Sequence, residues 1–384
     1  ASSLYFYAGI VLAATLFGWG VGGVLRGLTV RFIGRRNTAT YSVLGYGIFT
    51  LLTAFSGTYL VFVSLRFLTG VMLGSAGEGE SVFLAETHTD GRHARGGGSV
   101  YAGFGFGILL ASVAWFVIQT LDPQLLSGSL GAGAWRYLFI IGVVPMIFTL
   151  YLRRRAEPPE QRAEERDSGA EPTPITLSGI FGSSSLRGRI VVCVVTLFAS
   201  IAGWWGIAAW IPIYASSIAT DAGLAQPIRW AAVAGVVYGI GAIVGCLTVE
   251  PITDRIGRIG SLMFMLIGAG AAVQVLFLLL RTPYLLLVFV AVFGYFSVGQ
   301  LGWFAVYLPE LFPRAGRGVA LGTIYTIARL LAVFFPILVG IEITYFEGLT
   351  TVVPSLAMVY GVGIFVSLFL PLGMDSPVPE EHSS

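Results

Sequence analysis

The chain has 384 residues, of which 56% are hydrophobic and 11% are charged, and its mean hydropathy is +0.84. A soluble globular protein needs about a quarter charged residues, so this composition excludes that class and indicates a polytopic membrane protein. The formal net charge of +2 comes from arginines in short clusters between apolar runs. Such clusters are typical of loops between membrane helices and give no indication of nucleic-acid binding.

The residue pattern gives little indication of an enzyme. Both cysteines, Cys193 and Cys246, lie inside apolar runs, where they read as small buried hydrophobes. The three histidines fall in loops or in the tail. No Ser, His and Asp constellation, phosphate-binding glycine loop or metal cluster is evident, and the glycine-rich runs lie inside spans, where they serve helix contact. We therefore expect no catalytic residues, no metal and no cofactor.

Eleven apolar runs are long enough to cross about 30 Å of hydrocarbon at roughly 20 residues each. They are expected at Tyr7–Val30, Thr38–Phe55, Tyr59–Leu84, Ser99–Leu121, Trp135–Leu152, Ile190–Tyr214, Trp230–Val249, Ser261–Leu280, Pro283–Tyr307, Val319–Ile343 and Val353–Leu372. An all-α polytopic fold follows.

The loops between these runs predict the orientation. Sixteen arginines fall in the loops of one side and three in the loops of the other. Basic loops stay in the cytoplasm, so the richer side is predicted to be cytoplasmic, with Ala1 outside and Ser384 inside. A hydrophilic linker is expected at 153–189 and a cytoplasmic tail at 375–384. We expect a multi-pass protein of a bacterial inner membrane.

An internal repeat divides the chain. Gly34 aligns with Gly257 at an offset of 223 residues, and Glu86 aligns with Glu310 at an offset of 224. A repeat this long predicts two similar helical bundles, over 1–152 and 190–374. The sixth run has no partner, because its counterpart falls before Ala1. The expected explanation is a first helix that precedes this sequence, and a natural protein of eleven spans is the alternative.

Several motifs carry a family resemblance. They are GLTVRFIGRR at 27–36, Arg66-Phe67-Leu68-Thr69-Gly70 followed by Gly74 and Gly77-Glu78, Trp135-Arg136, and Pro309-Glu310-Leu311-Phe312-Pro313 followed by Arg317-Gly318. Together they resemble the major facilitator superfamily over nearly the whole chain, and most closely its proton symporters of organic acids and sialic acid and its organic-anion transporters. The resemblance implies twelve helices in two six-helix bundles, alternating access and a central cavity. Tyr101–Leu121 lacks the Gly-Pro signature of drug antiporters, which lowers efflux as an interpretation.

The resemblance implies a cytoplasmic latch at the repeated turns. Its residues here are Arg31, Gly34, Arg35, Asp254, Arg255, Gly257 and Arg258. The chain departs from the family pattern at Arg31, where Asp is usual, and at Glu250, where Gly is usual. Arg31 has either gained a partner among Glu86, Glu250 and Asp254 or adds to the positive charge of its side.

Glu78 is the predicted proton-coupling residue. It lies two turns short of the predicted cytoplasmic end of its run, too deep for a short side chain to reach the interface. A carboxylate at that depth is paired, protonated or in a water-filled cavity, and one whose pKa is raised by burial can load and release a proton. A structural ion pair is the alternative. Glu80 points to the other side of the same helix.

Arg329 is the predicted substrate ligand, because it lies near the middle of its run and its planar guanidinium matches a carboxylate at two points. An arginine on this helix binds the substrate's carboxylate in the organic-anion carriers that the chain resembles. Tyr325 shares its face. A fixed pair with a buried glutamate is the alternative. Further candidates are Gln300, Trp303 and Arg66.

Tryptophans near the ends of spans have two interpretations. Trp204, Trp205 and Trp210 occur in the outer half of the sixth run, where interface anchoring is the more usual role. Trp303 is deeper and is the better candidate for a cavity.

The sequence thus predicts a secondary active transporter that takes up a small organic anion, a carboxylate or an acidic sugar, together with protons. The expected partners are that substrate, protons and the lipid bilayer, and the expected state is a monomer. A porter for neutral sugars or polyols, or a sensor or inactive fragment on the same scaffold, are the alternatives. Glu78 and Arg329 favour transport, whereas the altered Arg31 and the absent first helix favour the non-transporting alternative.

Overall fold

A computed structural model describes residues 2–76, 97–121, 133–155, 184–312, 317–346 and 349–370. All regular elements in these ranges are helices, which confirms the predicted all-α fold. Each of the eleven apolar runs is occupied by helix in its described part. Eight helices of this part of the chain are long and apolar enough to cross a membrane, and the stretches Trp135–Phe148 and Val352–Ser367 are shorter apolar helices.

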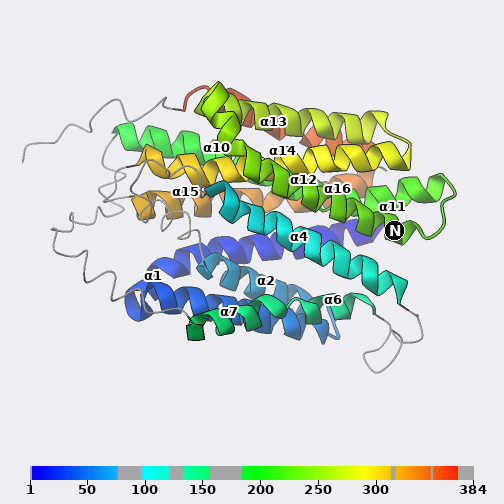
Figure 1. Cartoon of the computed structure of the whole chain (residues 1–384), viewed down its shortest axis with the longest axis horizontal. Coiled ribbons are helices and arrows are strands. Elements are labelled where there is room, and N and C mark those ends of the chain that lie inside the picture. The colour runs from blue at the N-terminus through cyan, green and yellow to red at the C-terminus, as the bar shows by residue number, and fades with distance from the viewer. Residues whose placement is uncertain are drawn as a thin grey trace, which may run out of the picture.

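The helices divide into those before and those after the predicted linker (Figure 1). The first group contains α1 (Ser2–Ala54), α2 (Tyr59–Ala76), α4 (Gly97–Thr120), α6 (Trp135–Ile141) and α7 (Val144–Arg155). The second group contains α10 (Ser184–Ala208), α11 (Ile211–Asp221), α12 (Pro227–Ile256), α13 (Arg258–Gln274) with a π-helical turn at Val275–Leu279, α14 (Pro283–Tyr307) with a 3-10 turn at Leu308–Leu311, α15 (Arg317–Ala332), α16 (Phe334–Phe346), α17 (Leu349–Leu356) and α18 (Met358–Ser367). Because 156–183 lies outside the described residues, the linker and the bundle boundaries stay predictions.

Four of the predicted spans are each built of two α-helices, and a proline accounts for the break in three of them. A proline ring collides with the carbonyl of the residue four positions earlier, so a helix ends there. The residues four before Pro145, Pro212 and Pro336 are Ile141, Ala208 and Ala332, and these are the last residues of α6, α10 and α15.

Gly34 and Gly257 adopt almost the same unusual backbone conformation. Gly34 has φ 77° and ψ 161° inside α1, and Gly257 has φ 78° and ψ 169° between α12 and α13. Positive φ is open to glycine at little cost, and both residues mark a reversal between two helices. The alignment that gave the offset of 223 residues therefore pairs two turns of the same shape.

Glycines also bring equivalent helices into backbone contact in the two parts of the chain. Gly18 and Gly22 of α1 lie against the backbone of α2 at Phe67 and Val71. Their counterparts at the same offset, Gly241 and Gly245 of α12, lie against α14 at Ala291 and Tyr295. A side chain at any of the four would overlap a carbonyl oxygen, so the close approach requires glycine.

Two seams join helices from the two ends of the sequence. In one, α1 packs against α15 and α16, with Gly9 against Pro336 and Gly23 against Thr326. In the other, α4 runs alongside α12 (Figure 1), with Gly239 against Leu109. Arg329, described next, lies at the first of these seams.

Candidate functional site

Arg329 lies on α15 with only 6% of its surface exposed. Its guanidinium carbon lies 4.2 Å from the centre of the Trp19 ring and 5.3 Å from that of Tyr325. Tyr325 shares the face of α15 with Arg329, as their spacing of four residues predicts, whereas Trp19 comes from α1. Aromatic faces attract a guanidinium, and this contact places the cation at a seam between the two parts of the chain.

A row of aromatic rings leads away from Arg329. Trp19 packs edge-on against Trp205 of α10, with 6.2 Å between ring centres, and Trp205 packs against Trp204 at 5.2 Å. Trp204 in turn contacts Phe104 of α4 at 5.0 Å. The row therefore crosses from one seam to the other, and both tryptophans of α10 lie inside it rather than at an end of the molecule.

A buried hydrogen-bonded chain starts at the far end of that row. Trp204 Nε1 donates to the Tyr238 hydroxyl at 2.8 Å, and that hydroxyl lies 2.9 Å from the Ser297 hydroxyl. One turn further along α14, Gln300 Nε2 donates to the Ser297 carbonyl oxygen at 2.9 Å. Ser297 and Gln300 are fully buried. The chain fixes polar side chains of α10, α12 and α14 against one another.

Two buried polar atoms around this chain have no hydrogen-bond partner among the described residues, Trp205 Nε1 and Gln300 Oε1. The buried hydroxyls of Tyr325 and Tyr360 interact with the side chains of Tyr101 and Gln300. Leaving such a group unsatisfied costs about 1 to 3 kcal/mol, and native structures contain few of them. The two atoms come from α10 and α14, and the Trp205 ring packs against Trp19, which lies under the Arg329 guanidinium.

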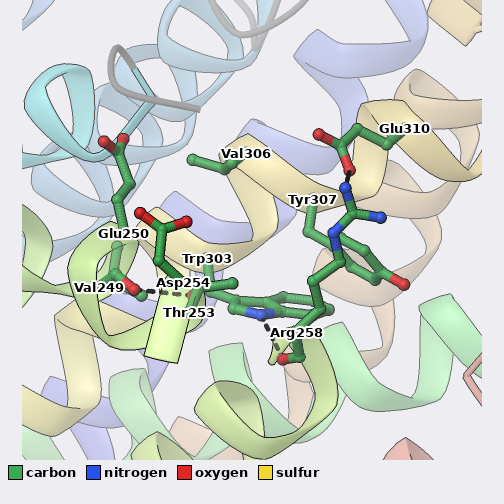
Figure 2. Close-up of a pocket in the computed structure, with 9 residues that line it drawn as sticks. All are labelled: Val249, Glu250, Thr253, Asp254, Arg258, Trp303, Val306, Tyr307 and Glu310. Carbon is green, nitrogen blue, oxygen red and sulfur yellow. Dashed lines mark hydrogen bonds and ion pairs between the residues drawn. The ribbon is translucent and has the colours of Figure 1, made fainter. Parts of the chain in front are cut away.

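A second site lies at the turn between α12 and α13, and Figure 2 shows it. It is a pocket of about 80 Å³, lined by Val249, Glu250, Thr253, Asp254, Arg258, Trp303, Val306, Tyr307 and Glu310. Arg258 pairs with Glu310 at 2.6 Å, and its guanidinium lies 4.9 Å from the centre of the Tyr307 ring. Trp303 Nε1 donates to the Arg258 carbonyl oxygen at 2.8 Å.

Glu250 connects this pocket to the other part of the chain. Its Oε1 accepts a hydrogen bond of 3.0 Å from the backbone N–H of Gly98, in the first turn of α4. A carboxylate at a helix N-terminus meets unsatisfied N–H groups and the positive end of the helix dipole. Glu250 therefore closes the α4–α12 seam at the predicted cytoplasmic end.

The structure brings some of the predicted site residues together and separates others. Arg329 and Tyr325 are in contact, and the aromatic row and the hydrogen-bonded chain link them to Gln300. Trp303 lies instead in the pocket at the repeated turns. Arg66 lies apart, near α6, where it donates to Thr69 at 3.1 Å and covers the Phe139 ring. Glu78 lies outside the described residues.

The predicted latch residues lie at two separate turns. Asp254 and Arg255 end α12, Gly257 and Arg258 open α13, and Gly34 breaks α1. The side chain of Arg35 is outside the described part. Arg31 is exposed, and within the described residues no ion pair joins it to Glu250 or Asp254.

Sequence reasoning missed Trp19, Tyr238, Ser297 and Tyr360. Each is a common residue of an apolar helix, and no spacing singles it out. The repeat offers a signal for Trp19 alone. Trp19 aligns at the offset of 223 residues with Ala242, and Ala242 lies against α4 in the second seam, so the repeat predicts that Trp19 also lies at a seam.

Taken together, the fold and the site define a helical membrane protein with a buried cation and a buried polar cluster between its helices. The Major Facilitator Superfamily model matches residues 5–336. The chain belongs to the major facilitator superfamily, which confirms the resemblance seen in its motifs.

Relatives agree with this membership. A putative metabolite transport protein of Haemophilus influenzae is 27% identical over 373 residues, which cover 94% of this chain and 86% of the relative. The cis,cis-muconate transport protein of Acinetobacter baylyi is 25% identical over 339 residues, covering 87% and 78%. The crystal structure of a D-xylose-proton symporter has the same fold, with a TM-score of 0.68 at 19% identity, covering 96% and 88%.

Proposed function

We propose that the protein is a secondary active transporter that takes up a small organic anion, a carboxylate or an acidic sugar, by alternating access. The observation that carries this proposal is the placement of Arg329. A permanent cation buried in a membrane span costs about 2.5 to 3.5 kcal/mol on insertion scales, so it needs a function there. A guanidinium stacked on aromatic rings has its donors in a planar fork, and that geometry suits a carboxylate.

The surroundings of Arg329 support the same proposal. The site lies between α1 and α4 on one side and α10, α14 and α15 on the other. A ligand held between two groups of helices is exposed to either side when the groups rock against each other. The muconate relative is named for an organic anion, which fits a cation as the anchoring group.

Coupling to protons is the second component of the proposal. Glu78 is the proposed proton carrier, because it is an acidic residue deep in the third apolar run. The structural likeness to a proton symporter supports the fold that such coupling uses. We place the protein in a bacterial inner membrane as a monomer, with the arginine-rich loops inside.

Uptake by purified protein in liposomes tests the whole proposal. Labelled mono- and dicarboxylates, acidic sugars and neutral sugars are offered with and without an inward proton gradient. We expect carboxylates or acidic sugars to accumulate only with the gradient. Accumulation of neutral sugars alone would overturn the substrate class, and accumulation without any gradient would overturn the coupling.

A further inference from the structure

Tyr325 contacts one residue with its ring and another with its hydroxyl group. The guanidinium carbon of Arg329 lies 5.3 Å from the centre of the ring, on the same helix, α15. The hydroxyl interacts with the side chain of Tyr101, which lies near the start of α4. Only 3% of the Tyr325 surface is exposed. This one side chain therefore connects the buried cation with a helix of the first group.

The two helices that this contact joins belong to different seams. Helix α4 packs along α12 and α14, whereas α15 packs along α1 and α10. Tyr101, Phe104 and Ile108 share one face of α4, and all three pack against the hydrophobic core of the second group. Phe104 contacts Trp204 of α10 at 5.0 Å. This face of α4 therefore reaches the second group beyond its own seam.

The contact between the two tyrosines lies on the cytoplasmic side of Arg329. Helix α15 begins at the predicted cytoplasmic end, and Tyr325 comes four residues before Arg329, a rise of about 6 Å. Tyr101 is three residues beyond Gly98, whose backbone N–H binds Glu250 at the same end. The contact therefore lies between the buried cation and the predicted cytoplasm.

We propose that Tyr101 and Tyr325 form the cytoplasmic gate of the site at Arg329. The two side chains hold α4 against α15 in the closed conformation, and they separate when the two groups of helices rock apart at that end. A pair of neutral hydroxyl groups suits a contact that must open, because exchanging it for water has a small net cost. This inference rests on the proposed alternating access, and it adds the residues that close one side.

Spin labels on the two helices measure the gate directly. Gly103 of α4 and Gly318 of α15 are exposed and have open space beside them, so Gly103→Cys and Gly318→Cys accept labels in a Cys193→Ala, Cys246→Ala background. Pulsed electron paramagnetic resonance then gives the fractions of molecules with a short and with a long distance between the labels.

We expect Tyr101→Phe to raise the ratio of long to short distances by about 2- to 12-fold, the effect of losing one hydrogen bond between neutral groups. Tyr325→Phe should raise the ratio by the same factor, and it keeps the ring beside the guanidinium. Because both changes break one contact, the double variant should match the single variants and not their product. Either single variant breaks the contact, so one that folds is sufficient.

Tyr295→Phe is the matched control. It removes a hydroxyl that accepts a hydrogen bond from Thr248 at 2.9 Å, and both residues belong to the second group of helices. We expect its distances to equal those of the labelled parent protein. Thermal melts of all variants show that the folded state is kept.

Two outcomes would overturn the gate. One is an unchanged ratio in the single variants, and the other is a double variant whose factor is the product of the two single factors. The distances are measured without substrate, so they are independent of the uptake assay. A protein that shows the expected shift but takes up no anion keeps the gate and loses the proposed substrate class. A protein that takes up anions with unchanged distances keeps the proposed function and loses the gate.

Discussion

The Glu250 carboxylate and the backbone N–H of Gly98 are joined by a hydrogen bond of 3.0 Å between residues 152 positions apart in sequence. The equivalent of Glu250 in the first part of the repeat is Gly27, which has open space beside it. The second part of the repeat therefore carries a side chain at this position where the first part has none, and the Glu250 side chain reaches from α12 across the seam to α4. In alternating access such a bond favours the conformation that is closed at the predicted cytoplasmic end.

We expect Glu250→Gln to open that end more often. Neutralising the carboxylate removes a charge-assisted bond at a helix N-terminus, a loss of about 1 to 2 kcal/mol, which shifts a two-state equilibrium by roughly 5- to 30-fold. Cys246 is buried on α12, where its carbonyl oxygen lies against Gly98 and its thiol donates to the Val298 carbonyl oxygen of α14, so it is a native reporter beside the seam. In a Cys193→Ala background, its rate of labelling by a membrane-permeant maleimide should rise by a similar factor.

Glu310→Gln is the control for this experiment. It breaks the pair with Arg258, which joins two residues of the same helical group and does not cross the seam. Its labelling rate should stay close to that of wild type. A Glu250→Gln protein that labels no faster than Glu310→Gln would show that the bond does not hold the seam.

We expect Arg329→Lys to lower the affinity for carboxylates by roughly one to two powers of ten. Lysine keeps the charge but loses the bidentate fork, and a strong charge-assisted pair is worth about 1.5 to 3 kcal/mol. Arg329→Gln should bind more weakly still. Thermal stabilisation by carboxylates measures both. If Arg329 instead serves a fixed ion pair, both variants lose folded protein in the membrane before they lose affinity.

Glu78→Gln should separate exchange from net uptake. If Glu78 carries the coupled proton, a side chain that cannot ionise abolishes uptake driven by a proton gradient, whereas exchange of internal for external substrate needs no net proton release and continues. Both rates are measured in the same proteoliposomes. Glu80→Gln is the matched control on the opposite helix face, and we expect it to keep both activities. Normal accumulation by Glu78→Gln would leave Glu78 with a structural role.

Gly241→Ala should destabilise the protein strongly. The new methyl group would overlap the Ala291 carbonyl oxygen of α14, so the two helices must separate. We expect a loss of several kcal/mol, within the range for overpacked or displaced cores. Gly322→Ala on α15 has open space around it and should be neutral or stabilising by about 0.5 to 1 kcal/mol. Thermal melts in detergent compare the two, and equal melting temperatures would contradict the close contact.

The repeat and the helix breaks were accessible to sequence reasoning because they depend on local chemistry. A glycine needed for positive φ and a proline that ends a helix four residues earlier are visible as letters, as Gly34, Gly257 and Pro336 illustrate. The contacts of α1 with α2 and of α12 with α14 also follow in part, because glycines at equivalent positions of the two parts mark where these backbones approach.

The composition of the ligand site was less accessible. Gln300 and Trp303 share a helix face, but a rise of about 4.5 Å, nearly one turn, separates them. That turn places Gln300 in the buried polar chain and Trp303 in the pocket beside Arg258. Which polar atoms remain unsatisfied depends on partners from several helices, and no single run of sequence contains that information. The same holds for Trp19, whose role depends on α15.

The tryptophans next to Arg329 provide an intrinsic fluorescence probe of the site. Trp19, Trp204 and Trp205 form one contiguous group, and the Nε1 of Trp205 is buried without a partner in the described residues. Indole emission responds to the local electric field, so an anion that neutralises the guanidinium beside Trp19 changes the fluorescence of the group. Titration of unlabelled protein with unlabelled acids therefore gives dissociation constants directly, and Trp19→Phe identifies the part of the signal that arises at the cation.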